Sequence, residues 1–169
     1  SRARHFLLNG DPDRALEELN APDAPTAPCT IRLRIEIARE LGDQISVISS
    51  LRSLLRLDPR PGTRIELARS VWRERGAQAG LSELAPLLSA PPTGLDPLLA
   101  AAELLAEMRA DRSMGELLQR ARRAEATENV LSTVNARYER RCQRPQAAYR
   151  AFGQAISTEG STIPQLEKA

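Results

Sequence analysis

Few residues of this chain could carry out catalysis. His5 is the only histidine, and it lies close to the start of the sequence. The two cysteines, Cys29 and Cys142, are far apart, so they form neither a disulfide framework nor a zinc-binding motif. No HExxH motif or glycine-rich phosphate loop occurs, and adjacent acids such as Glu17 and Glu18 are typical of a solvated helix surface. The sequence therefore predicts that the chain is not an enzyme and uses neither a cofactor nor a metal.

An arginine-rich stretch at residues 137–150 is one candidate for binding chemistry. It contains five arginines and a single acid: Arg137, Arg140, Arg141, Arg144, Arg150 and Glu139. Such a cluster could contact nucleic-acid phosphates or an acidic protein partner. It could also be a solvated helix end, where cations complement the helix dipole. Binding to single strands usually adds aromatic side chains for stacking, and Tyr138 and Tyr149 are the two aromatic residues nearby.

Composition limits the class of protein. The 169 residues carry a net charge of +2, and aromatic residues make up 3% of them, so the core must be aliphatic. Apolar runs are short and broken by charged residues, which excludes a membrane-spanning helix. Unpaired cysteines favour a reducing compartment, so we expect a cytoplasmic protein. Because the chain opens with Ser1, a signal or anchor could precede it, and the location would then be periplasmic or membrane-anchored.

The elements that must position these residues are helices. Apolar residues recur at helical spacing before Gly42, and Asp43 can then cap a second helix that Pro59 stops. The stripes on these two helices are Ile31, Ile35, Ala38 and Leu41, followed by Val47, Ile48, Leu51, Leu54 and Leu55. The stretch 38–59 therefore predicts a helical hairpin. Thr63 and Thr127 are predicted to cap later helices, and Pro86 to kink or shorten another.

Turn signals like the one at Gly42 recur along the chain. They fall at Gly10-Asp11, Gly42-Asp43, Gly76-Ala77, Ala110-Asp111 and Gln143-Arg144, with a period near 34 residues. No strand-like alternation occurs. We therefore predict an all-α fold of about five helical hairpins, at about residues 1–27, 28–61, 62–94, 95–126 and 127–157. The proline-rich stretch 21–28 is expected to be a loop, and residues 158–169 a flexible tail.

The spacing after each turn resembles the tetratricopeptide repeat family over residues 1–157. Gly42 is followed by Val47, Leu51, Leu54 and Pro59, and Gln143 by Ala148, Phe152 and Ala155. The first helices lack the usual Leu-Gly pair of that family. The resemblance implies an α-α superhelix, a solenoid in which hairpins stack to share one core. It also implies a scaffold or adaptor that binds a segment of a protein partner in a concave groove.

The resemblance further implies which side chains line that groove. The implied partner-binding residues are Arg32, Glu36, Arg39, Ser70, Arg73, Leu104, Arg137, Arg140 and Arg141. Arg39 and Arg73 lie one period apart, so they are expected to stack as a ladder that binds the carboxylates of an extended, acidic segment. The alternative is that neighbouring acids, such as Glu36 beside Arg39, simply neutralise these arginines.

Two other functions stay open from the sequence. One is an assembly or regulatory module of a bacterial envelope system, anchored by a segment before Ser1. A version of it resembles inner-membrane assembly proteins that join such repeats to a rubredoxin-like metal knuckle, on the basis of Cys142 and residues 161–163. The further cysteines that such a metal site needs are absent. The other function is nucleic-acid binding by a solenoid through residues 137–150.

Overall fold

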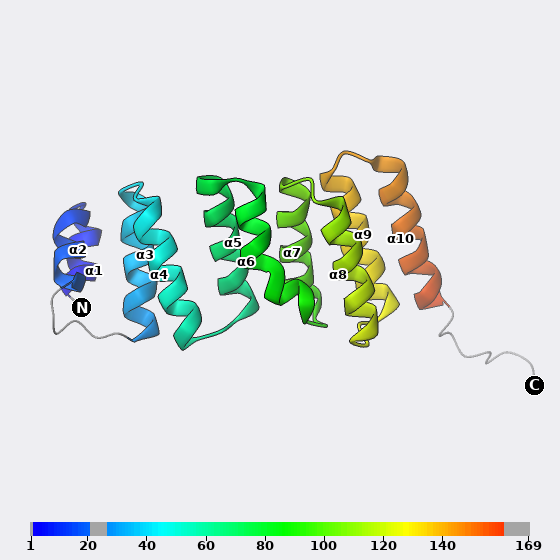
Figure 1. The fold of residues 1–169 in the computed structure, drawn as a ribbon, viewed down its shortest axis with the longest axis horizontal. Helices are drawn as coiled ribbons and strands as arrows, with labels where there is room; N and C mark the ends of the chain where they lie inside the picture. Colours follow the sequence, from blue (N-terminus) through cyan, green and yellow to red (C-terminus); the bar gives the residue numbers. More distant parts are fainter. Residues whose placement is uncertain (1, 21–26, 161–169) are drawn as a thin grey trace, which may run out of the picture. The chain divides into compact units, whose positions relative to one another are not determined.

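A computed structural model describes residues 2–20 and 27–160, and these residues contain helices and turns but no strand. The prediction of an all-α fold is confirmed in this part of the chain. Ten helices follow one another there: α1 (Arg2–Leu8), α2 (Pro12–Asn20), α3 (Pro28–Glu40), α4 (Gln44–Leu57), α5 (Pro61–Arg75), α6 (Ala77–Ser89), α7 (Leu95–Glu107), α8 (Asp111–Arg123), α9 (Glu128–Arg141) and α10 (Pro145–Gly160) (Figure 1). The chain divides into two compact units, residues 1–84 and 85–169, and the boundary between them falls inside α6.

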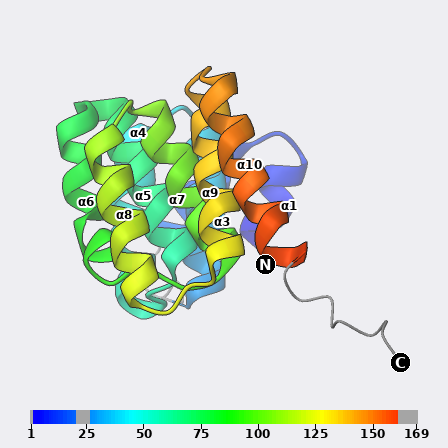
Figure 2. The ribbon, with the colours of Figure 1, turned by 90° about the vertical axis from the view of Figure 1, so that its right-hand side faces the viewer.

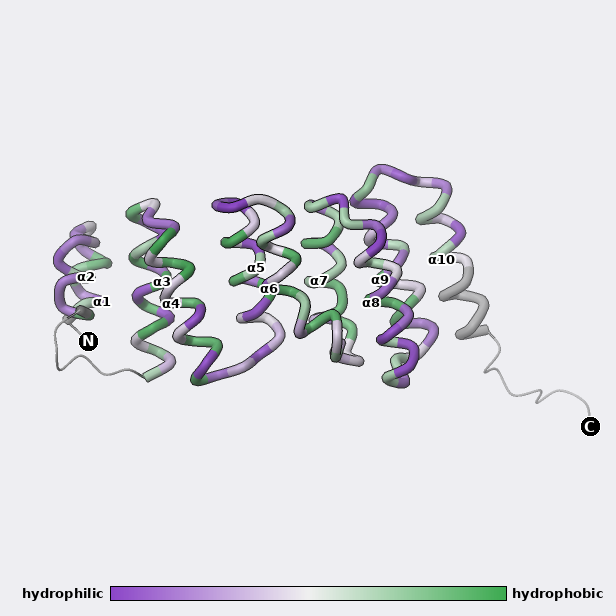
Figure 3. Tube along the Cα trace, in the orientation of Figure 1, coloured by the Kyte–Doolittle hydropathy of each residue, from purple (hydrophilic) through white to green (hydrophobic). Residues whose placement is uncertain are grey.

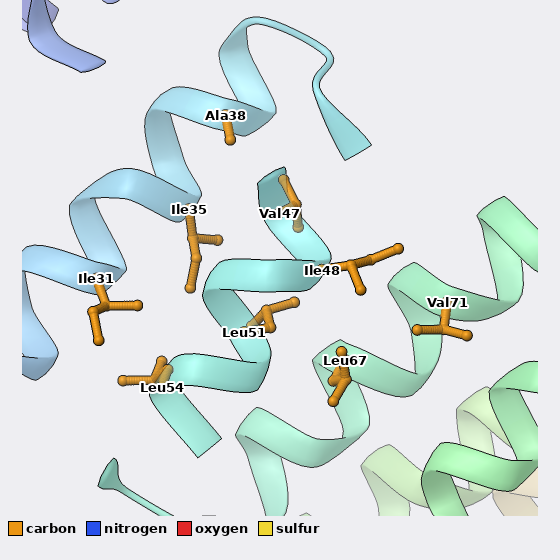
Figure 4. Packing of buried hydrophobic residues seen from close by; sticks show 9 residues of the cluster. All are labelled: Ile31, Ile35, Ala38, Val47, Ile48, Leu51, Leu54, Leu67 and Val71. Atoms are coloured by element: carbon orange, nitrogen blue, oxygen red, sulfur yellow. The ribbon is translucent and has the colours of Figure 1, made fainter. Parts of the chain in front are cut away.

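In the first unit each helix packs against the next from α1 to α5. The apolar stripes of α3 and α4 pack against each other and against α5, the next helix along the chain. The core cluster consists of Ile31, Ile35, Ala38, Val47, Ile48, Leu51, Leu54, Leu67 and Val71 (Figure 4). A second cluster joins Ala3, Ala15 and Leu19 to Ile37 on the opposite side of α3. Because α3 contributes to both clusters, it is the central helix of this unit.

In the second unit α9 is the central helix. It packs against α7, α8 and α10, and both ribbon views show it between α7 and α10 (Figures 1 and 2). The core is aliphatic, as composition requires, and its fully buried members include Leu98, Leu105, Leu117 and Val134. Most of α7 is hydrophobic along its length, whereas the turn between α9 and α10 is hydrophilic (Figure 3).

Several helices end in the same backbone motif. At Gly42 the chain turns left-handed, with φ of 69°, and the Asp43 amide donates to the Ala38 carbonyl at 2.8 Å. Gly10 ends α1 in the same way, with φ of 74°. The equivalent residues at the ends of α7 and α9 are Arg109 and Gln143, with φ of 54° and 61°. The fourth turn residue is therefore Arg109, one residue before the predicted Ala110.

Predicted helix starts are confirmed at two positions and wrong at one. The Asp43 carboxylate accepts from the Ser46 amide at 3.0 Å, and the Thr127 hydroxyl accepts from the Val130 amide at 3.4 Å. Thr63 does not cap α5, because that helix begins earlier, at Pro61, and Thr63 is buried inside it. Proline at the first position of a helix suits the start, since no amide hydrogen is needed there.

The remaining sequence predictions concern helix ends and loops. Helix α6 includes Pro86 and ends soon after it, at Ser89. Helix α10 continues to Gly160, so the predicted boundary of the tail, at residue 157, is wrong. Most of the loop predicted at 21–28 and the rest of the tail lie outside the described residues, but helix α3 already begins at Pro28.

Candidate functional site

The outer side of α9 carries three exposed arginines. Helical spacing places Leu131, Val134 and Tyr138 in the core of the second unit. The same spacing turns Arg137, Arg140 and Arg141 outward, and all three are exposed. We call these three residues the arginine face. The burial pattern thus shows that all three are exposed on α9, and their predicted role in lining a groove stays a prediction.

The arginine face is only weakly neutralised by the protein itself. Arg141 Nη2 lies 3.7 Å from Glu107 Oε1, which is too long for a hydrogen bond, in a pair whose arginine is well exposed. Exposed pairs of this kind contribute little. Among the described residues no acid forms an ion pair with Arg137 or Arg140. These two cations are therefore available to a negatively charged ligand.

A cleft of about 350 Å³ lies next to this face, where the α7–α8 turn meets the α9–α10 turn. We call it the turn cleft. Its lining is mostly charged or polar and consists of Ala106, Glu107, Arg109, Asp111, Arg141, Cys142, Gln143 and Arg144. All of these residues belong to the second unit. Three guanidinium groups and two carboxylates thus surround one small volume.

Asp111 holds the two turns together. Because Ala110 occupies the N-cap position, Asp111 is the first residue of α8 and its carboxylate is not used for capping. That carboxylate accepts from the Tyr138 hydroxyl at 2.5 Å and from Arg144 Nη2 at 2.8 Å. The bonds from Arg144 and Tyr138 lower the pKa of Asp111, and the same carboxylate raises the pKa of Arg144. Burial, followed by the bond to Asp111, raises the pKa of Tyr138 above its usual range.

We expect this tie to make stability depend on pH in acid. The pKa of Asp111 is lower in the folded protein, so its contribution to stability is complete above the pKa of an aspartate in the unfolded chain, about 3.9. It is lost as the pH falls through the lower, folded value. The melting temperature of an Asp111→Asn variant should therefore be below that of the unmodified protein at pH 6, and the gap should narrow progressively as the pH falls below about 4. Circular dichroism melts from pH 3 to 7 measure this, and a constant gap would contradict the role of the Asp111 charge.

The predicted partner-binding residues of the first unit lie partly where expected. Arg32, Glu36 and Arg39 are exposed along one side of α3. Arg32 lies 3.5 Å from Asp58, and Arg39 lies 3.6 Å from Glu66 on α5. The acid that pairs with Arg39 is therefore Glu66, and not the Glu36 that the sequence suggested could neutralise it. These contacts are long and exposed, and they contribute little.

Two of the predicted partner-binding residues, Ser70 and Leu104, are buried. Ser70 is buried, and its backbone carbonyl accepts from Gln44 Nε2 at 3.2 Å. Leu104 is fully buried, so it cannot line a groove, and its assignment was wrong. The cause is the fourth turn residue: counting from Arg109 rather than Ala110 moves the outward position from Leu104 to the exposed Glu103. Successive side chains of an α-helix point in directions about 100° apart around the helix axis, so a shift of one residue exchanges a buried position for an exposed one. Arg73 is exposed on α5.

The structure removes one support for nucleic-acid binding. Tyr138 is buried and its hydroxyl is bonded to Asp111, so its ring is not available to stack on a base. Tyr149 is well exposed on α10. Both cysteines are free thiols, and the described residues contain no group of acids, histidines and cysteines able to hold a metal ion. None of the described helices combines the length and apolar character needed to cross a membrane.

Sequence reasoning missed Arg109 and Asp111 as parts of a site. The signal for Arg144 was present, since it belongs to the arginine-rich stretch, but Arg109 and Asp111 lie on a different turn of the chain. Only the packing of α7 and α8 against α9 brings them to Arg144.

Comparison with known proteins does not add a relative: no protein-family model, curated protein or solved structure matches this chain.

Proposed function

We propose that this chain is a helical-repeat protein-interaction module of the tetratricopeptide type, and that it binds an acidic segment of a protein partner. The single observation that carries the proposal is the arginine face, with Arg137 and Arg140 exposed and unopposed by acids among the described residues. Support for a solenoid of stacked hairpins comes from the alternation of helices and tight turns near every 34 residues. Each guanidinium can form a fork of two parallel hydrogen bonds with one carboxylate.

An acidic protein segment suits this surface better than a nucleic acid. Single-stranded nucleic acids bind through a cationic groove combined with stacking aromatic rings. Here Tyr138 is buried, which leaves Tyr149 as the exposed aromatic side chain of the arginine-rich stretch. The spacing of Arg137, Arg140 and Arg141 along one helix side favours a partner whose carboxylates alternate along an extended chain.

Charge reversal on the arginine face tests the proposal. The probe is a fluorescein-labelled peptide with alternating Glu and Ala, and the matched peptide has Gln in place of Glu. The double variant Arg137→Glu with Arg140→Glu should weaken binding of the Glu peptide at least about tenfold, because two charge-assisted contacts become repulsive. Fluorescence polarisation at low and physiological salt measures the affinity, which should fall as salt rises.

The control has the same change of net charge on another helix. Arg122→Glu with Arg123→Glu reverses two exposed arginines in the last turn of α8, at the opposite end of that helix from Asp111, and should change the affinity less than about twofold. An equal loss in both double variants would show nonspecific attraction and would contradict the proposal. Tighter binding of single-stranded RNA than of the Glu peptide, in the same salt, would contradict it in favour of a nucleic-acid ligand.

A further inference from the structure

We propose that the turn cleft binds one carboxylate side chain of the acidic partner, and that Arg109 is the residue that selects it. The inference rests on the proposed function and adds a specific pocket to the arginine face. Arg141 belongs to both surfaces, since it is exposed on α9 and lines the cleft. A segment lying along α9 therefore passes the mouth of the cleft.

The ion pairs around the cleft leave one of its arginines without an acidic partner among the described residues. Arg144 is occupied, because it lies 2.8 Å from Asp111 and 3.6 Å from Glu139. Arg141 has Glu107 as its acid, at 3.7 Å. Arg109 lowers the pKa of Asp111 through its charge, but no described acid forms an ion pair with it. Arg109 is therefore the arginine of the lining that has no ion-pair partner among the described residues, and its guanidinium can bind an added carboxylate.

The backbone at Arg109 has a conformation that glycine adopts with less strain. Its φ of 54° lies in the left-handed region, which residues with a side chain rarely adopt. Glycine occupies the equivalent turn position at Gly10 and Gly42, where a helix ends in the same motif. Gln143, which also lines the cleft, has the same left-handed conformation after α9, so both turns carry a strain that glycine would relieve. Arg109 contributes a guanidinium group to the lining of the cleft.

The size and polarity of the cleft fit a carboxylate side chain. A volume of about 350 Å³ admits an Asp or Glu side chain together with water. The planar guanidinium of Arg109 can donate a hydrogen bond to each oxygen of that carboxylate, whereas the ammonium group of a lysine acts as a single point charge. The carboxylates of Glu107 and Asp111 repel a second acid, so the cleft should accept one acidic side chain and reject a cluster of them.

Substitution of Arg109 tests the inference with the same Glu and Gln peptides. Arg109→Gly should weaken binding of the Glu peptide about fivefold to tenfold, because one charge-assisted contact is lost. The same variant should raise the midpoint of urea unfolding, because glycine relieves the left-handed strain. Arg109→Lys keeps the charge and should recover part of the affinity. In the unmodified protein, the Arg109 Nε–Hε signal in nitrogen-15 NMR spectra should shift as the Glu peptide is added.

The outcomes separate this inference from the proposed function. If Arg109→Gly binds the Glu peptide as tightly as the unmodified protein, while Arg137→Glu with Arg140→Glu weakens it, the cleft is not a carboxylate pocket and the arginine face stands. If the unmodified protein does not distinguish the Glu peptide from the Gln peptide, the proposed function fails and the inference fails with it. An Arg109 signal that does not move at saturating peptide would overturn the cleft alone.

Discussion

Replacing Leu51 by alanine is expected to lower the free energy of unfolding by about 2–5 kcal/mol. Leu51 is fully buried in the middle of α4, within the cluster formed by α3, α4 and α5. Truncation removes apolar surface and leaves a cavity that the surrounding side chains fill only in part. Because each helix of the first unit packs on the next, damage at α4 affects the contacts on both sides. Urea unfolding followed by circular dichroism at 25 °C measures the change.

Leu57 on the same helix is the matched control. Its exposed fraction is 55%, so Leu57→Ala should change the free energy of unfolding by no more than about 0.5 kcal/mol. The two variants share the chemical change and the helix but differ in burial. Equal effects of the two variants would show that α4 does not pack as the structure describes.

Replacing Gly80 by alanine is expected to destabilise the protein by about 1–3 kcal/mol, although alanine is the better helix former. A Cβ at Gly80 would lie 2.7 Å from the Cβ of Trp72 and 3.0 Å from the carbonyl oxygen of Ala68, both on α5. Neither atom can move by rotating a side chain, so the two helices must separate. Near-ultraviolet circular dichroism should show a changed environment of Trp72, and urea unfolding gives the magnitude.

Gly115 provides the opposite expectation from the same substitution. It lies inside α8, and a Cβ there would meet nothing within 4 Å. Gly115→Ala should therefore stabilise the protein by up to about 1 kcal/mol through helix propensity alone. If Gly80→Ala also proved stabilising, α5 and α6 could not approach each other as closely as the structure describes.

The fold could be predicted to a large extent because helices are specified by local signals. The helix before Gly42 follows from the helical spacing of Ile31 and Ile35. The helix after it follows from the helical spacing of Val47 and Leu51 and from the cap at Asp43. Prediction failed where the local signal was ambiguous. Thr63 looks like a cap, but Pro61 starts the helix before it. Gly80 gave no sign of its role, because the need for glycine comes from α5 and not from its own helix.

The candidate site could be predicted only in part. The exposure of Arg137, Arg140 and Arg141 follows from the sequence, because a single helix carries them and its apolar residues fix which side faces water. Leu104 was misplaced because the fourth turn has no glycine to mark its left-handed residue. The choice between Arg109 and Ala110 is a shift of one residue, and that shift exchanges the core for the surface.

The sequence alone determined the helical class of this protein, the positions of most turns and the cationic side of α9. These properties depend on neighbouring residues, which the chain order supplies directly. The tertiary structure decided which charges meet. Asp111 bonds to Tyr138 and Arg144 only because α8 and α9 pack together. The turn cleft likewise forms only where the α7–α8 turn and the α9–α10 turn come together. Contacts between residues far apart in sequence depend on the relative position and rotation of whole helices, which local spacing does not encode.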